Sequence, residues 1–319
     1  MRLDEIKKIV IAGAGVMGAS IAQILAQNGY NAVVYDIGDA FLEKGKELIS
    51  VNQQTLISAG DITPKQSEKD MSHISFRCDK GCFEGADFVI EAIIENMDAK
   101  LAFWTDISRR VPDGAILTSN TSGLSLTEIA GAVEHPERFA GMHWLNPPHL
   151  IPLIEVIKEE RTAASTAQFI YDLAVRIGKK PVMLNKDAAG FIVNRLQFAL
   201  LREAMHIVDS GIASVEDIDH VFKYGMGLRY ACCGPFEIAD LGGLDTFYKI
   251  SGYLFKDLNN STEVSPLLAD AYANKNFGVK SGKGFYDYSG GRDKEVLRKR
   301  DESLIALSKC LSRIDNMNK

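Results

Sequence analysis

Short apolar runs alternate with longer amphipathic stretches over the first 185 residues of the chain. Runs rich in β-branched residues and bounded by polar or glycine-containing segments are typical of buried strands, and we expect strands at 9–13, 32–36, 88–93, 116–120, 139–144, 153–157 and 181–185. Helix-length amphipathic stretches lie between them, notably at 17–28, 39–59, 99–110 and 163–177. This alternation predicts βαβ units in an α/β fold with a mostly parallel sheet.

A polar segment follows the amphipathic stretch 39–59 and extends to about residue 70. Within it, Asp61 indicates a turn, while Thr63 and Pro64 are suited to the N-cap and the first position of a new helix. We therefore expect a helical hairpin inserted between the second and third of the predicted strands.

The strand pattern stops near Asp187, and the rest of the chain is predicted to be helical. Helices are expected at 190–210, 214–224, 234–256, 264–275 and 293–312, with Gly, Asn and Ser at the breaks. The change in pattern predicts two domains, 1–186 with the α/β fold and 187–319 with an all-α fold.

Charge and composition narrow the class of protein. The 36 Lys and Arg against 42 Asp and Glu leave a net charge of −6, which argues against a nucleic-acid partner because phosphates require a basic face. Five cysteines with no CxxC pair form neither a secreted disulfide framework nor a zinc site, so we expect a cytoplasmic protein and no metal. The apolar stretch 9–26 contains three spaced glycines, which fit a strand, turn and helix better than a membrane span.

Residues 13–18, GAGVMG, match the G-x-G-x-x-G pattern of a dinucleotide-binding turn. An apolar strand precedes the motif and a helix follows it, which is the context that the motif requires. Gly13 would allow the tight turn, Gly15 the approach of the pyrophosphate and Gly18 close packing of helix on strand, while Val16 and Met17 complete the loop. Asp36 ends the second strand, where a carboxylate accepts ribose hydroxyls and repels a 2′-phosphate, so the predicted cofactor is NAD.

His143 differs from the other histidines because it ends an apolar strand just before a break at Asn146. The carboxyl ends of strands are where open α/β sheets place their ligands. Glu155 lies twelve residues later inside another apolar run, where an unpaired carboxylate would be costly. A buried Glu bonded to a His orients the ring and makes it a general base, although a satisfied core pair is an equal alternative at this point.

Four further strings carry a resemblance to a known family. They are SNTSGLSLTEIA (119–130), RFAGMHWLNPPHLIPLIEVI (138–157), GFIVNR (190–195) and GVKSGKGFYDY (278–288). Together with the glycine loop they closely resemble the L-3-hydroxyacyl-CoA dehydrogenase family from about residue 6 to residue 288. The resemblance implies a Rossmann-like N-terminal domain, a helical C-terminal domain that forms a homodimer, and a small-molecule substrate bound between them.

The resemblance also implies roles for individual residues. His143 would be the base that takes the 3-hydroxyl proton and Glu155 its orienting partner, while Ser122 and Asn194 would hold the substrate oxygen. Positions that match cofactor contacts in relatives are Glu95, Lys100, Asn146 and Lys280. Ser122 could instead be a helix N-cap, and Asn194 could be a solvated amide on its helix.

Residues 227–237, GLRYACCGPFE, depart from the family pattern and place Arg229 where no charge is customary. Arg229 is suited to a bidentate grip on a carboxylate, or it forms an ion pair at a dimer interface or on the surface. This feature and the charged tail after Tyr288 resemble the branches that oxidise free hydroxy acids, the gulonate and carnitine dehydrogenases.

Three functions follow from these features. The first is reversible NAD-dependent oxidation of a short-chain (3S)-3-hydroxyacyl-CoA, such as 3-hydroxybutyryl-CoA, to the 3-ketoacyl-CoA. The second is oxidation of a small free hydroxy acid held by Arg229. The third, an inactive dehydrogenase fold with a structural or sensing role, has no use for the set Ser122, His143, Glu155 and Asn194.

Overall fold

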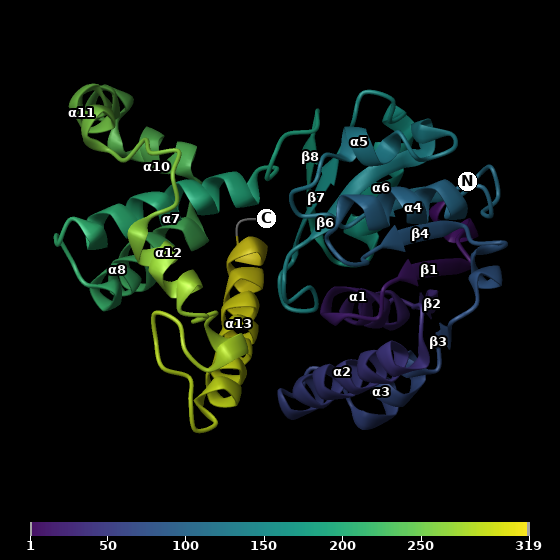
Figure 1. The fold of residues 1–319 in the computed structure, drawn as a ribbon. Coiled ribbons are helices and arrows are strands. Elements are labelled where there is room, and N and C mark those ends of the chain that lie inside the picture. The colour runs from purple at the N-terminus through teal and green to yellow at the C-terminus, as the bar shows by residue number, and fades with distance from the viewer. Residues whose placement is uncertain (1, 318–319) are drawn as a thin grey trace. The chain divides into compact units, whose positions relative to one another are not determined.

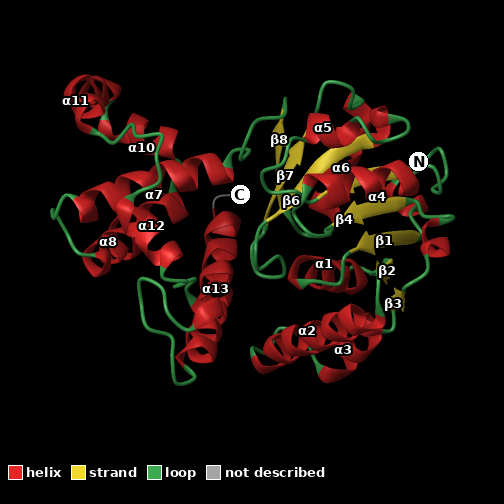
Figure 2. Cartoon of the chain, in the orientation of Figure 1, coloured by secondary structure: helices red, strands yellow, loops and turns green. Residues whose placement is uncertain are grey.

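The computed structural model describes residues 2–317 and divides into two compact units, Met1–Arg195 and Leu196–Lys319. Figure 1 follows the chain from its N-terminus to its C-terminus, and Figure 2 shows strands in yellow in the first unit and helices in red in both. Among the described residues, none of the helices combines the length and the apolar character needed to cross a bilayer.

One eight-stranded sheet forms the centre of the first unit, with the strand order β3-β2-β1-β4-β5-β6-β7-β8. The strands are β1 (Lys8–Ala12), β2 (Asn31–Tyr35), β3 (Ile74–Arg77), β4 (Phe88–Glu91), β5 (Ile116–Ser119), β6 (Phe139–Trp144), β7 (Leu153–Ile157) and β8 (Lys180–Leu184). All neighbouring strands pair in parallel except β6 and β7, which are antiparallel. The prediction of a Rossmann-like α/β fold with a mostly parallel sheet is therefore confirmed.

Helices cover both faces of the sheet, because successive residues of a strand point to opposite sides. Ile9 and Ile11 of β1 pack in one apolar cluster with α1 (Val16–Gln27) and α6 (Ala164–Arg176). Val10 packs in the other cluster with α4 (Met97–Ile107) and α5 (Leu126–Ala130). Both faces of the central strands are thus buried, as a parallel sheet requires.

The predicted helical hairpin is present as α2 (Asp39–Ser58) and α3 (Pro64–Met71). Thr63 caps α3 by accepting a hydrogen bond from the amide of Gln66, and Pro64 takes the first helical position. The sequence prediction missed β3, which follows α3 directly and pairs with β2 at the edge of the sheet. Three of its four residues are only partly buried and Arg77 is exposed, so the strand carries little of the apolar signal that marks the other strands.

The second unit is built from helices joined by loops, as predicted. It contains most of α7 (Val193–Asp209), α8 (Val215–Val221), a π-helical segment (Phe222–Met226), α9 (Gly227–Cys232), α10 (Pro235–Gly242), α11 (Leu244–Asp257), α12 (Pro266–Ala273) and α13 (Arg292–Met317). The single helix expected over 234–256 is wrong, because α10 ends before Gly243. This residue has a φ of 89°, a conformation that breaks the helix and that glycine adopts readily.

Candidate active site

The glycine loop joins β1 to α1, and its three glycines have different surroundings. Gly13 has a φ of 106°, and a Cβ there would overlap the carbonyl oxygen of Ala92. A Cβ on Gly18 would overlap the carbonyl oxygen of Gly13, so this glycine allows the helix to approach the strand. A Cβ on Gly15 would meet no atom within 4 Å. The fold itself therefore requires Gly13 and Gly18, whereas the space at Gly15 is open to a ligand.

The N-terminus of α1 begins at this loop with Val16 and Met17, and no side chain caps it. Asp36 follows β2 and holds the loop from the side, since its Oδ2 accepts the amide hydrogen of Ala14 at 2.7 Å. Its Oδ1 accepts the amide hydrogen of Ile37, also at 2.7 Å. An uncapped helix N-terminus attracts phosphate groups through its free amides and its dipole.

The structure brings His143 and Glu155 into direct contact. They are opposite each other in the antiparallel register of β6 and β7, and His143 Nδ1 lies 2.7 Å from Glu155 Oε2. The two residues are 3% and 0% exposed. Because they are cross-strand partners, the pairing of the strands fixes their contact.

Glu155 also binds the start of α7. Its Oε1 accepts the amide hydrogens of Ile192 at 2.8 Å and Val193 at 3.0 Å. Burial alone would raise the pKa of Glu155, but the hydrogen bonds from His143 and from these two amides outweigh it and lower the pKa. The carboxylate is therefore ionised at neutral pH and directs its charge toward the imidazole.

Ser122 and Asn194 also meet. The amide nitrogen of Asn194, in the first turn of α7, donates to the backbone carbonyl of Ser122 at 2.9 Å. Ser122 is exposed and does not cap a helix, because the N-cap of α5 is Ser125, which accepts a hydrogen bond from the amide of Glu128. Glu155 and Asn194 thus connect the middle of β7, the start of α7 and the loop that carries Ser122.

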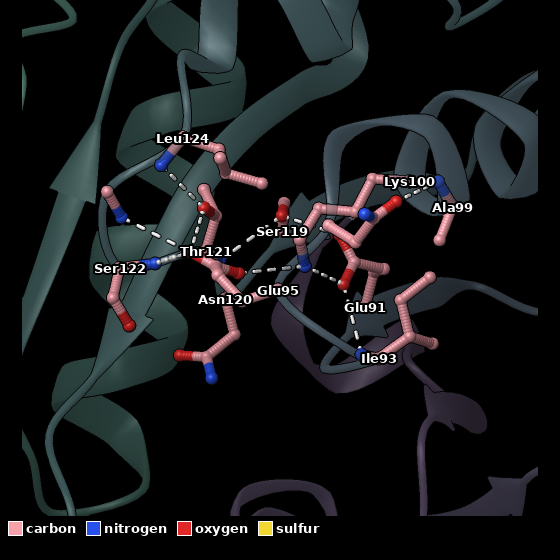
Figure 3. Close-up of polar contacts among 12 residues, drawn as sticks. Glu91, Ile93, Glu95, Ala99, Lys100, Ser119, Asn120, Thr121, Ser122 and Leu124 are labelled. Carbon is pink, nitrogen blue, oxygen red and sulfur yellow. Dashed lines mark hydrogen bonds and ion pairs between the residues drawn. The ribbon is translucent and has the colours of Figure 1, made fainter. Parts of the chain in front are cut away.

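Three charged residues form a network beside this loop (Figure 3). Lys100 Nζ lies 2.5 Å from Glu91 Oε1 and 3.3 Å from Glu95 Oε2. Glu95 Oε1 accepts hydrogen bonds from the hydroxyl of Thr121 at 2.6 Å and from the amide of Ser122 at 2.7 Å. Sequence analysis selected Glu95 and Lys100 but missed Glu91, although Glu91 stands in an apolar strand just as Glu155 does.

The loop after β6 carries Asn146, which is exposed. Lys179, also missed by sequence analysis, holds this loop by donating to the carbonyls of Pro148 at 2.6 Å and Ile151 at 2.9 Å. Its ammonium also lies 5.5 Å from the centre of the Trp144 ring. Burial lowers the pKa of Lys179 to about 8.

Arg229 and Lys280 lie in the second unit, on α9 and on a short 3-10 turn, Val279–Ser281. Arg229 borders a hollow of about 440 Å³ that is lined by Leu228, Arg229, Cys232, Cys233, Ile238, Leu241, Gly242 and Phe247.

The comparisons with known proteins cover both units. A family model described as "3-hydroxyacyl-CoA dehydrogenase, NAD binding domain" matches residues 8–188, and one described as "3-hydroxyacyl-CoA dehydrogenase, C-terminal domain" matches residues 190–288. The chain belongs to the 3-hydroxyacyl-CoA dehydrogenase family. It is therefore an oxidoreductase of the class that acts on CH–OH groups with NAD.

Individual members of the family resemble the chain to different extents. The "5-formyl-3-hydroxy-2-methylpyridine 4-carboxylate 5-dehydrogenase" of Mesorhizobium japonicum is 37% identical over 96% of this chain and 98% of that protein. A solved structure of a dehydrogenase of this name, described as an NAD+-dependent dismutase, has a TM-score of 0.90 and covers 96% of this chain and 99% of its own.

Two family members named for 3-hydroxybutyryl-CoA match less of the chain. The "Probable 3-hydroxybutyryl-CoA dehydrogenase" of Bacillus subtilis is 39% identical over 89% of this chain and 98% of that protein. The (S)-3-hydroxybutyryl-CoA dehydrogenase structure from Ralstonia eutropha is 32% identical with a TM-score of 0.75, and it covers 89% of this chain and all of its own.

The residues at the glycine loop fit the family's cofactor. The free N-terminus of α1 can bind the two phosphates of NAD, and the open space at Gly15 lets them approach the backbone. Asp36 offers carboxylate oxygens at the end of β2, where a ribose hydroxyl would donate to them. When bound, NAD supplies the acceptor for a hydride.

Proposed function

We propose that this protein oxidises an alcohol carbon of a small molecule with His143 as the general base. The contact of 2.7 Å between His143 Nδ1 and Glu155 carries the proposal. In this arrangement Nδ1 keeps its proton and donates a hydrogen bond to the ionised carboxylate. Nε2 then has a free lone pair and can take the proton of the substrate hydroxyl. As the proton arrives, Glu155 stabilises the imidazolium, and NAD, when bound, would supply the acceptor for the hydride.

Ser122 and Asn194 orient the substrate oxygen in this proposal. A hydroxyl and an amide can both donate to an oxygen that gains negative charge during the reaction. The hydrogen bond from Asn194 to the Ser122 carbonyl supports their acting together, because it keeps both residues at one place. Glu95, Lys100, Asn146 and Lys280 are proposed to contact NAD in the same reaction, together with the glycine loop and Asp36.

We propose a carboxylate-bearing alcohol or hydrated aldehyde as the substrate, with Arg229 binding the carboxylate. The match to the pyridine-carboxylate dehydrogenase supports this choice. It covers 96% of the chain, so it must extend past residue 288 into the C-terminal tail. Arg229 has no acidic partner among the described residues, so its guanidinium is available to a ligand. 3-Hydroxybutyryl-CoA is the second candidate, favoured by relatives such as the Bacillus protein.

A spectrophotometric NADH assay separates these candidates. Acetoacetyl-CoA would be compared with a panel of free hydroxy and keto acids and aromatic aldehyde carboxylates. The Arg229→Met variant should raise KM for the free acid by ~10-fold or more while leaving NADH binding unchanged. Rapid turnover of acetoacetyl-CoA that Arg229→Met does not affect would instead favour the second candidate.

The His143→Gln variant tests the proposed base itself. It should bind NADH normally and lose ~10²–10⁴-fold in kcat with whichever substrate the panel identifies. Near-normal turnover by this variant would overturn the proposal.

We further infer that the protein is a homodimer assembled through its second unit. Large apolar side chains there are exposed, among them Phe236 at 85%, Tyr248 at 82% and Leu241 at 80%. An exposed apolar surface of this kind marks a protein interface.

The five cysteines of the protein are free, which supports a reducing compartment such as the cytoplasm.

A further inference from the structure

Glu91 ends β4 with a side chain that is fully buried and whose two carboxylate oxygens both accept hydrogen bonds. Its Oε1 accepts from Lys100 Nζ at 2.5 Å and from the amide of Ile93 at 3.1 Å, and its Oε2 accepts from the hydroxyl of Ser119 at 2.6 Å. Lys100 is only 1% exposed. Neither family resemblance nor the proposed reaction gives Glu91 a role.

An ion pair at this depth is an expensive way to hold a fold together. Removing both charges from water costs several kcal/mol per ion, and a well-packed apolar pair of similar volume is often as stable. Val89 and Trp104, on the elements that carry Glu91 and Lys100, are fully buried apolar side chains. The charges therefore call for an explanation beyond packing.

The contacts of Lys100 lead toward the candidate site. Lys100 lies between Glu91, which is buried, and Glu95, whose side chain is 42% exposed. Glu95 Oε1 in turn accepts hydrogen bonds from the Thr121 hydroxyl and from the amides of Ser122 and Gly123. Burial would raise the pKa of Glu95, but Thr121, Ser122 and Lys100 together lower it, so Glu95 holds this turn as a carboxylate.

A second set of contacts runs from Glu91 through the end of β5. The Ser119 hydroxyl, which donates to Glu91, accepts the amide hydrogen of Thr121 at 3.3 Å. The backbone carbonyl of Glu91 accepts the amide hydrogen of Asn120 at 2.7 Å. Asn120 Oδ1 accepts the amide hydrogen of Trp144, the residue next to His143, at 2.8 Å. Figure 3 shows these residues close together: Glu91, Ser119, Asn120, Thr121 and Ser122.

We propose that Glu91 is a positioning residue for the dehydrogenase reaction. It fixes Lys100 and Ser119, and through them it sets the place of Glu95 and of the turn that presents Ser122. The inference rests on the proposed function, because Ser122 matters only if it orients the substrate oxygen. A misplacement of about 1 Å at such a group can lower the rate ~10²-fold.

Three variants test this: Glu91→Gln, Lys100→Met and the double variant. Glu91→Gln leaves the buried Lys100 with the exposed Glu95 alone, and Lys100→Met leaves the buried Glu91 without a cation, so both should lower stability and kcat. The double variant removes both charges and should regain wild-type resistance to urea. Its kcat at saturating NAD, where a weakened contact of Lys100 with the cofactor is compensated, should nevertheless remain ~10–100-fold below wild type, because Glu95 has lost its link to β4. If kcat returned together with stability, the pair would be merely structural and the proposal would fail.

The control is a matched ion pair on the surface of the same unit. Lys80 Nζ and Asp106 Oδ2 are 2.6 Å apart, with side chains 48% and 31% exposed. The Lys80→Met/Asp106→Asn double variant makes the same change in charge and should leave kcat within about twofold of wild type.

Ser119→Ala provides a measurement if the Glu91 variants do not fold. It removes only the hydroxyl between Glu91 and Thr121, and should lower kcat several-fold without loss of cooperative unfolding. An unchanged kcat in Ser119→Ala would contradict the proposal. His143→Gln, measured in parallel, distinguishes the two failures: full activity there overturns the proposed function, whereas a recovered double variant overturns only the role of Glu91.

Discussion

The two units differ in how much apolar surface they bury. In the first, the strands β4 and β6 are buried over their whole length, and Trp104 and Trp144 are 0% and 2% exposed. In the second, Met205 is the one apolar side chain that is buried among the described residues. The first unit thus has an extensive hydrophobic core of its own. The helices of the second unit leave most of their apolar side chains exposed, which is typical of a surface that binds another surface.

The difference is reflected in the placement of polar groups. The first unit buries Glu91, Lys100, His143 and Glu155 in hydrogen-bonded contacts that only a closed interior makes strong. Ion pairs of the second unit, such as Lys249 with Asp245, are exposed to water and contribute little to stability. Substitutions at buried polar positions of the first unit should therefore have large effects on unfolding, and those at exposed positions of the second unit small ones.

The protein offers a direct measurement of this contrast. Its two tryptophans, Trp104 and Trp144, both belong to the first unit. Tryptophan fluorescence during urea unfolding therefore follows the first unit alone.

The largest effect is expected for Glu155→Leu. This change leaves His143 and the amides of Ile192 and Val193 without their acceptor. The free energy of unfolding should fall by about 3–5 kcal/mol and kcat by ~10²–10⁴-fold, measured by urea titration and the NADH assay. Glu160→Leu, five residues away at an exposed position, is the control and should change neither quantity. Unchanged activity in Glu155→Leu would remove the basis for His143 as the base.

Gly13→Ala and Gly15→Ala form a matched pair in the glycine loop. At Gly13 a Cβ meets the Ala92 carbonyl at a φ of 106°, so the free energy of unfolding should fall by about 2–4 kcal/mol. At Gly15 a Cβ meets nothing in the protein, so stability should stay within about 0.5 kcal/mol while NADH binding weakens ~10-fold or more. Equal NADH affinity in Gly15→Ala and wild type would mean that the phosphates bind elsewhere.

The buried amine of Lys179 should make the free energy of unfolding depend on pH. Burial lowers its pKa in the folded chain from 10.5 to about 8, so above pH 8 the folded state holds fewer protons than the unfolded state. Stability should therefore rise with pH, by about 2 kcal/mol between about pH 7 and 9.5. Lys179→Met lacks this titration, so the difference between wild type and variant should grow in favour of wild type over that range. If the difference in stability between wild type and Lys179→Met did not change with pH, the amine of Lys179 would be solvated and the prediction would be wrong.

The smallest effect on the first unit is expected from Phe236→Ser and Tyr248→Ser in the second. Tryptophan-detected unfolding at low protein concentration should change by less than about 0.5 kcal/mol. Sedimentation velocity should instead show a shift from dimer toward monomer, because these exposed side chains are proposed to form the interface. A destabilisation comparable to that of Glu155→Leu would break the contrast between the units.

Local patterns predicted the elements whose causes are local. The Thr63–Pro64 start of α3 follows from capping chemistry, and the helix after GAGVMG follows from its apolar periodicity. The strand β3 was missed because an edge strand with little buried surface leaves no apolar pattern. The break before Gly243 depends on a backbone conformation that a glycine permits but does not require.

The parts of the site that the sequence did not predict depend on contacts between residues that are far apart in the sequence. His143 and Glu155 were paired in advance because one strand ends in a histidine and the next holds a carboxylate among apolar residues. Glu91 carries the same signal in β4, but its partners Lys100 and Ser119 lie on a helix and on another strand. No spacing in the sequence reveals that Lys179 reaches the loop after β6, since the sheet brings these segments together.

The two hydrogen bonds that Asp36 accepts from the backbone have an evolutionary consequence. In a Rossmann fold, the acidic residue after the second strand binds the ribose hydroxyl of NAD, so binding of the phosphorylated dinucleotide would first require its replacement. Here that first step would also leave two amides without acceptors and loosen the turn on which either dinucleotide depends. Descendants of this chain would thus reach a new coenzyme only if a compensating acceptor arose beforehand, which makes the present preference hard to reverse.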